Sequence, residues 1–289
     1  MSDGVTVRVP ATTANLGPGF DCLGAALGTY LTIKISHSSE SEVVGRGRRH
    51  PIPKNLTYRS IVAAYEAAGK PPPNVRIETV GSYPSARGMG ASASAIVAGL
   101  VGADALGELG LGEQVLAELA TRIEGHPDNV MPALLGGLVL SVGPRWLRMT
   151  PVKTISPMIL VTSQRFKTGA ARKAVPSTFS REDAVANAGA TAALVAILGG
   201  LAGPEGLMAA TEDRLHEPYR LPLMKPTESV RAQMREAGVP TALSGAGPSL
   251  VSLVATGSLE AVRKSTERLL PQGWSVLTPG WDLGGATVG

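Results

Sequence analysis

The chain has 289 residues, of which 44% are hydrophobic and 17% are charged, so it is long and apolar enough to bury a substantial core. Its net charge of +4 comes from dispersed basic residues, which argues against a nucleic-acid partner and suits a small anionic substrate. One cysteine, Cys22, excludes an internal disulfide framework, and no signal-like or membrane-spanning apolar run occurs. We therefore expect a cytoplasmic protein with no membrane partner.

In the first half of the chain, predicted strands alternate with predicted helices. The apolar patterns predict strands at 5–9, 31–35, 75–80 and 138–142. They predict helices at 56–68, 92–109 and 113–124. Residues 10–24 are expected to form a Gly-rich loop, and residues 37–54 a loop or hairpin.

The second half follows a proline-flanked crossing at 150–157. Its patterns predict strands at 158–162, 239–243, 249–255 and 274–278. They predict helices at 182–201, 204–215, 226–237 and 258–270. Strands mixed with helices indicate an α+β fold, which we divide into domains at 1–153 and 154–289.

The most informative segment is a Gly-rich turn at 84–95 that leads into a helix of small residues. Gly88 and Gly90 let the backbone approach a ligand, and Ser92 lies where the helix begins. The free amides and the dipole of a helix N-terminus favour phosphate. The segment lacks the lysine of a Walker A loop and the third glycine of a dinucleotide-binding loop. A tight turn capped by Ser92 is the alternative interpretation.

Two further Gly-rich stretches accompany this turn. The first, at 10–24, contains Asn15-Leu-Gly-Pro-Gly-Phe-Asp21, and the other reads Ser-Gly-Ala-Gly-Pro-Ser at 244–249. From residue type alone, Asn15 and Asp21 are turn residues. A fourth segment, at 124–130, reads Glu-Gly-His-Pro-Asp-Asn-Val.

Together and in this order, these stretches resemble the GHMP small-molecule kinases. The sequences of the first stretch, at 10–24, and of the fourth, at 124–130, are similar to those of homoserine kinases. The resemblance covers nearly the whole chain. It implies ATP and Mg²⁺ as cofactors and transfer of the γ-phosphoryl group to the side-chain hydroxyl of L-homoserine, in threonine biosynthesis. It also implies a ribosomal-protein-S5-like N-terminal domain, a ferredoxin-like C-terminal domain, and a homodimer.

The resemblance assigns the amino-acid substrate to polar residues from four segments. The substrate-binding residues it implies are Asn15, Asp21, His126, Arg172 and Arg220. In this scheme Asp21 pairs with the ammonium group, Asn15 fixes the hydroxyl end, and both arginines bind the carboxylate. A planar guanidinium suits that role because it pairs with a carboxylate through two hydrogen bonds.

The catalytic residues implied are Asn15, Thr168, which would lie beside the reacting hydroxyl, and Asn129. Some related kinases carry an aspartate base where Asn129 falls, and an amide cannot accept a proton. Catalysis would therefore rest on positioning and charge stabilisation, with Asp128 as the alternative base.

The nucleotide and the metal are assigned mostly to the Gly-rich turn. The cofactor-binding residues implied are Asn55, Pro84, Arg87, Gly88, Met89, Gly90, Ala91, Ser92, Ala93 and Ser94. Ser92 and Glu118 would hold Mg²⁺, which prefers hard oxygen ligands. The alternative for Glu118 is a helical ion pair with Arg122. Ala91 departs from the family loop, which usually has serine there.

Two other functions stay open. One is phosphorylation of another small alcohol by a related kinase. The other is a weakly catalytic protein that binds an amino acid or nucleotide for regulation.

Overall fold

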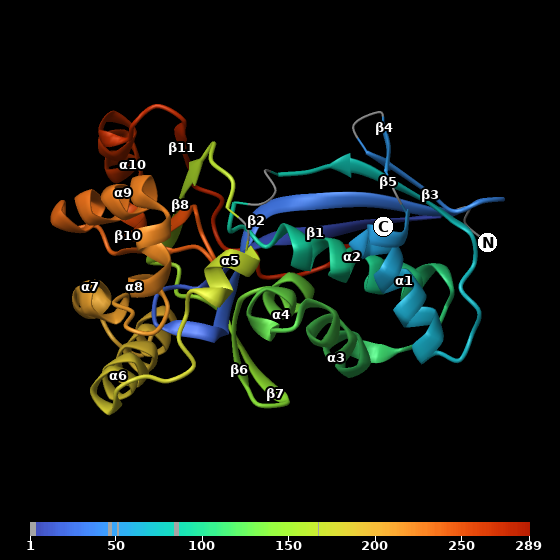
Figure 1. The fold of residues 1–289 in the computed structure, drawn as a ribbon, viewed down its shortest axis with the longest axis horizontal. Coiled ribbons are helices and arrows are strands. Elements are labelled where there is room, and N and C mark those ends of the chain that lie inside the picture. Colours follow the sequence, from blue (N-terminus) through green and yellow to red (C-terminus); the bar gives the residue numbers. More distant parts are fainter. Residues whose placement is uncertain (1–3, 46–47, 51, 84–86, 167) are drawn as a thin grey trace.

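The computed structural model describes residues 4–45, 48–50, 52–83, 87–166 and 168–289, and Figure 1 shows its arrangement. The larger sheet has eight strands. Six of them lie in the order β12 (Thr287–Val288), β1 (Gly4–Asn15), β2 (Gly19–His37), β5 (Val75–Gly81), β3 (Glu42–Gly45), β4 (Arg48–His50). β6 (Leu138–Val142) pairs with β2 and also with β7 (Arg145–Met149). Only the β3–β5 pair is parallel among these described pairings.

Four helices pack against one face of this sheet, as Figure 1 shows: α1 (Leu56–Ala67), α2 (Ala91–Leu106), α3 (Gly112–Glu124) and α4 (Pro127–Leu135). The core between them contains alternating valines and isoleucines of β1 and β2 and the apolar face of α2. Small residues let α2 lie close to the sheet. A Cβ on Gly102 would lie 2.4 Å from Cδ1 of Ile35.

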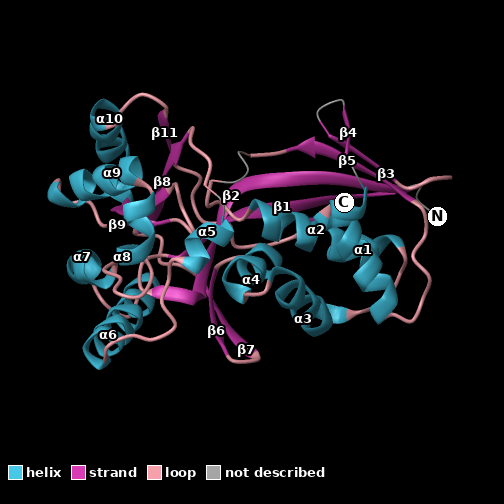
Figure 2. Ribbon diagram, in the orientation of Figure 1, coloured by secondary structure: helices cyan, strands magenta, loops and turns pink. Residues whose placement is uncertain are grey.

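The second half builds a smaller antiparallel sheet in the order β11 (Trp274–Leu277), β8 (Ile155–Thr162), β10 (Leu250–Ala255), β9 (Thr241–Leu243). Figure 2 shows the helices of this half. They are α5 (Thr168–Lys173), α6 (Arg181–Leu198), α7 (Leu207–Ala210), α8 (Glu217–Arg220), α9 (Lys225–Glu236) and α10 (Leu259–Leu269).

Residues 278–289 return from the smaller sheet to the larger one. The indole of Trp281 donates to the carbonyl of Ile155 at 2.8 Å, and the Asp282 amide donates to the carbonyl of Ala26 at 3.0 Å. β12 then pairs with β1. The larger sheet thus contains residues from both ends of the sequence, and the division at 153 and 154 stays a prediction.

The predicted α+β class is confirmed, and most predicted elements lie within a few residues of the observed ones. The predicted loop at 10–24 is wrong, because β1 continues to Asn15 and β2 begins at Gly19. The helix predicted at 204–215 is a short 3₁₀ turn followed by α7. α4, α8, β7 and β12 were not predicted. None of the described helices is long and apolar enough to cross a membrane.

Candidate active site

One cavity of about 380 Å³ brings the three Gly-rich stretches together with the α3–α4 junction and with α5 and α8. Its lining residues are Asn15, Asp21, Leu56, Arg87, Gly88, Met89, Gly90, Ala91, Ser92, Glu124, His126, Asp128, Asn129, Arg172, Arg220, Gly245, Ala246 and Gly247. Segments that lie far apart in the sequence thus share one site.

The turn before α2 forms one wall of the cavity. Gly88 and Gly90 both have left-handed backbones, with φ of 78° and 67°. A Cβ on Gly88 would lie 2.1 Å from the Ser244 carbonyl oxygen, so only glycine fits there. α2 begins at this wall, and the first backbone N–H groups of a helix have no hydrogen-bond acceptor within the helix. Nε of Arg87 is buried without a hydrogen-bond partner among the described residues. This wall therefore suits a phosphate chain.

The side chains of Ser92 and Glu124 are in contact where this wall lines the cavity. The Ser92 hydroxyl donates to Oε2 of Glu124 at 2.8 Å. Glu124 is the last residue of α3, where Gly125 ends the helix in a left-handed conformation with φ of 93°. The pair presents a hydroxyl and a carboxylate to the cavity, which is a hard oxygen set of the kind that Mg²⁺ prefers.

The structure does not bring Glu118 to this site. Glu118 is exposed on α3 and accepts a hydrogen bond from Nε2 of Gln114 at 2.7 Å. It precedes Glu124 by six residues, which is about 9 Å along a helix. The carboxylate of α3 that lines the cavity is thus Glu124 and not Glu118. The alternative ion pair of Glu118 with Arg122 is not among the described salt bridges either.

The turn between β1 and β2 also lines the cavity, through Asn15 and Asp21. Asn15 and Asp21 both have positive φ, at 68° and 58°, a conformation that costs free energy in residues other than glycine. Two hydrogen bonds hold the Asn15 side chain: its Oδ1 accepts from the Asp21 amide at 3.0 Å, and its Nδ2 donates to the Gly245 carbonyl at 2.9 Å. The turn is therefore fixed from both sides.

Asp21 and two arginines form the charged end of the cavity. Nη1 and Nη2 of Arg172 donate to the two carboxylate oxygens of Asp21 at 2.9 and 2.8 Å. Arg220 also lines the cavity and is 2% exposed. Its Nε donates to the Ala171 carbonyl at 3.3 Å, so α8 and α5 are linked. One carboxylate and two guanidinium groups complement the charges of an amino acid.

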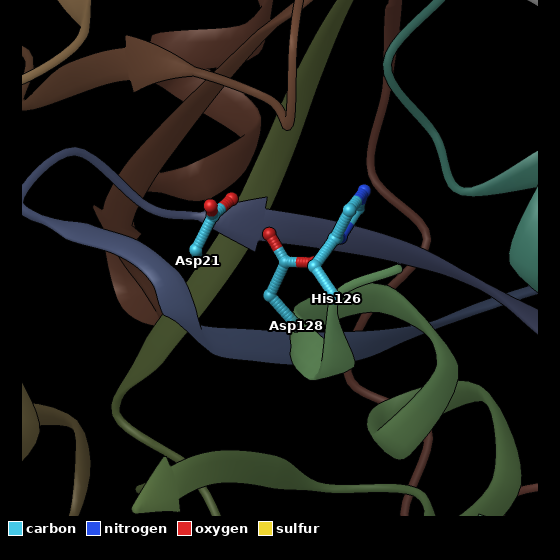
Figure 3. A group of neighbouring side chains, drawn as sticks. All are labelled: Asp21, His126 and Asp128. Atoms are coloured by element: carbon cyan, nitrogen blue, oxygen red, sulfur yellow. The ribbon is translucent and has the colours of Figure 1, made fainter. Parts of the chain in front are cut away.

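His126 and Asp128 complete this end from the start of α4, as Figure 3 shows. Together with Asp21 they offer three ligand atoms that lie within 4.8 Å of one another. Pro127 at the first helical position favours this turn. Burial lowers the pKa of His126, but the hydrogen bond and charge of Asp128 outweigh burial and raise it above its ordinary value. Because the guanidinium of Arg172 already pairs with Asp21, and His126 with Asp128, neither carboxylate is free of a cationic or hydrogen-bonding partner, which argues against a metal ion in this group.

His216, which sequence reasoning missed, holds the β1–β2 turn against Arg220. Its Nε2 lies 2.8 Å from the Gly17 carbonyl, and its Nδ1 lies 3.2 Å from Nη1 of Arg220. The carbonyl can only accept and the guanidinium can only donate, so the imidazole is neutral with its proton on Nε2. Its ring stacks on Phe20 at 5.1 Å. Burial, together with the charge of Arg220, lowers the pKa of His216.

A pH effect on stability follows from this contact. A folded-state pKa below the unfolded value means that His216 stabilises the fold above about pH 6.5 and that this contribution is lost as the pH falls. We expect His216→Gln, which keeps a donor for Gly17, to lose less free energy of unfolding than the wild type between about pH 8 and pH 5.5. Urea unfolding at both pH values measures the difference. Parallel losses in the two proteins would contradict the neutral, buried imidazole. His126 shifts in the opposite direction and is common to both proteins, so it cancels.

Several residues implied by the resemblance lie elsewhere. Asn55 caps α1, where its Oδ1 accepts from the Tyr58 amide at 2.9 Å. Ala93 and Ser94 are fully buried, and the Ser94 hydroxyl donates to the Pro10 carbonyl at 2.8 Å. Neither these three residues nor Glu118 line the cavity. Thr168 is the first residue of α5, but its side chain, like Pro84, lies outside the described part of the chain.

Comparisons with known proteins identify the family of this chain. Residues 55–137 match the family model described as the GHMP kinases N terminal domain. A homoserine kinase of Streptomyces coelicolor is 40% identical over 98% of this chain and 94% of its own. A homoserine kinase of Synechococcus is 41% identical over 90% of this chain and 89% of its own. The crystal structure of homoserine kinase from Cytophaga hutchinsonii has a TM-score of 0.87 at 26% identity and covers 100% of this chain and 98% of that one.

The fold is that of the GHMP small-molecule kinases, a class of ATP-dependent enzymes. Within this class, the chain belongs to the homoserine kinase family.

Proposed function

We propose that this enzyme transfers the γ-phosphoryl group of ATP to the side-chain hydroxyl of L-homoserine, giving O-phospho-L-homoserine on the route to threonine. One observation carries the proposal: a single cavity joins an anion-binding turn to a carboxylate and two guanidinium groups. The reaction breaks the bond between the γ-phosphorus of ATP and the β–γ bridging oxygen, which leaves with ADP, and forms a bond from that phosphorus to the substrate oxygen, whose proton passes to solvent. The names of the relatives support this substrate.

The substrate is a zwitterion, and the charged end of the cavity contains groups of both signs. Its ammonium would take the place of Arg172 at Asp21, close to Asp128. Its carboxylate would accept hydrogen bonds from the guanidinium groups of Arg172 and Arg220. Since each partner of the Asp21–Arg172 ion pair gains a new opposite charge, binding exchanges one ion pair for two. The Asn15 side chain, which donates to the Gly245 carbonyl, lies next to the charged end of the cavity. The hydroxyl of the substrate would lie beside Asn15 and point toward the turn at Gly88 and Gly90.

We infer that Mg²⁺ is held by Glu124 and Ser92, because their oxygens already meet and face the cavity. Bound there, the ion would neutralise charge on the phosphate oxygens. The amides at the start of α2 do the rest of the phosphate binding, so the alanine at position 91 removes a hydroxyl but no backbone donor.

We propose that no side chain accepts the proton of the reacting hydroxyl. Asp128 is 2% exposed and already accepts from His126, which supports a role in shaping the pocket. Asp128→Asn should therefore lower kcat less than about tenfold, whereas loss of a general base costs about 10²–10⁴-fold. Stopped-time assays at saturating substrates measure kcat, with circular dichroism as the folding control. A loss in the larger range with normal substrate binding would make Asp128 the base.

ADP release with and without L-homoserine tests the proposed function. We expect turnover only when L-homoserine is present, and a product with one phosphomonoester by ³¹P NMR. A panel of small alcohols tests the related-kinase alternative, which gains support if another alcohol has a higher kcat/KM. Binding of homoserine and ATP without turnover would favour the regulatory alternative.

The homodimer and the cytoplasmic location are implied by family resemblance and stay predictions. Sedimentation equilibrium on the purified full chain tests the first. Fractionation of the source cells tests the second.

A further inference from the structure

Thr12 lies on β1 directly behind the cavity wall and is completely buried. Its hydroxyl donates to Oδ1 of Asn129 at 2.6 Å, across 117 residues of sequence. Its backbone amide donates to the carbonyl of Met89 at 3.2 Å. One residue thus connects the phosphate-binding turn to the first turn of α4.

These contacts fix the orientation of the Asn129 carboxamide. On one side, Oδ1 accepts the Thr12 hydroxyl. On the other, Nδ2 lies 3.4 Å from Oδ1 of Asp128. A carboxylate oxygen only accepts, so a flipped amide would place two acceptors face to face. Asn129 also lines the cavity. Because its Oδ1 is already bonded to Thr12, the group that can interact with a ligand in the cavity is an N–H of Nδ2.

The packing around the hydroxyl leaves no room for adjustment. A Cβ on Gly90 would lie 1.8 Å from Oγ1 of Thr12 and 3.0 Å from Oδ1 of Asn129. The phosphate-binding turn, Thr12 and Asn129 are therefore stacked in direct contact. A change at Thr12 is transmitted to Asn129 rather than absorbed by empty space.

We propose that Thr12 is a positioning residue, which holds Asn129 with its N–H group toward the oxygens of the phosphoryl group in transit. This inference rests on the proposed kinase reaction. A donor fixed in advance at the place where negative charge is redistributed stabilises the transition state without reorganisation. Asn129 is the residue that touches the reacting atoms, and Thr12 acts through it.

Replacement of Thr12 by valine tests this role, because it removes the hydroxyl at nearly constant volume. We expect Thr12→Val to lower kcat about 10- to 100-fold while the KM values of ATP and L-homoserine change less than about twofold. Thr12→Ser, which keeps the hydroxyl, should recover most of kcat. Thr241→Val is the matched control: Thr241 is also fully buried and hydrogen-bonded, to Ser252 at 2.7 Å, but Ser252, unlike Asn129, does not line the cavity.

A double-mutant cycle separates positioning from a structural role. If Thr12 acts through Asn129, then adding Thr12→Val to Asn129→Ala should cause no further loss of kcat. Losses that multiply, or an unchanged kcat in Thr12→Val, would overturn the inference while leaving the kinase function in place. Thr12→Ala is the second variant, and failure of both variants to fold while Thr12→Ser folds would assign Thr12 to the fold alone. A wild type that does not phosphorylate L-homoserine would refute the proposed function itself.

Discussion

Glu124→Gln should lower kcat about 100- to 1,000-fold. Gln keeps the shape and can still accept the Ser92 hydroxyl, which Glu124 receives at 2.8 Å. It lacks the negative charge that attracts a divalent cation, and the Lewis-acid contribution of such an ion is several kcal/mol. The loss should diminish as the Mg²⁺ concentration rises, because weaker binding is overcome by mass action. Initial rates over a Mg²⁺ series, with Mn²⁺ binding followed by electron paramagnetic resonance, measure both effects.

Glu118→Gln is the matched control, on the same helix and with the same chemical change. Glu118 is exposed and contacts Gln114, so its replacement should leave kcat and the Mg²⁺ dependence within about twofold. The reverse outcome, with a normal Glu124→Gln enzyme and a crippled Glu118→Gln enzyme, would restore the ligand that the family resemblance implied.

Arg172→Ala should raise the KM of L-homoserine about 10- to 100-fold and leave the KM of ATP nearly unchanged. A hydrogen bond between charged groups contributes about 1.5–3 kcal/mol, and Arg172 already makes two such bonds to Asp21. The same variant should lose far less with 3-aminopropan-1-ol, which has the ammonium and hydroxyl groups of the substrate but no carboxylate. Steady-state assays with both alcohols isolate the carboxylate contribution.

Lys173→Ala provides the control for this prediction. Lys173 is the exposed neighbour on α5 and does not line the cavity, so its loss removes one positive charge without removing the guanidinium contact. Equal effects of Arg172→Ala on both alcohols would mean that Arg172 holds Asp21 in place and does not bind the carboxylate.

Without the family resemblance, which alone grouped Asn15 and Asp21 with Arg172 and Arg220, the part of the site that could be predicted from the sequence is the part whose residues are close neighbours along the chain. His126, Asp128 and Asn129 follow one another around a helix start, and Gly88 to Ser92 form one turn. For such residues, local geometry alone ensures proximity. Glu124 belongs to the same motif as His126. The direction of its side chain, however, depends on where α3 ends, and the motif does not give that position.

Contacts that span the sequence could not be predicted in this way. The bond from Thr12 to Asn129 and the contact of His216 with Gly17 depend on how strands and helices pack, and neither leaves a periodic pattern. Glycine and proline content predicted a loop at 10–24. In the structure β1 and β2 pair with each other through most of this region, so the sheet satisfies backbone groups that composition assigned to a turn.

The return of residues 278–289 to the larger sheet has a consequence for biosynthesis. On the ribosome, β1 and β2 emerge first and can pair at once, but the outer edge of β1 must wait for β12. Until then a hydrophobic strand presents unpaired amides and carbonyls, which is the kind of edge that recruits other chains. The edge of β1 at Val7 and Arg8 is thus covered by residues translated about 280 positions later, Thr287 and Val288. From the synthesis of β1 until that of β12, this edge lacks the strand that covers it in the folded protein.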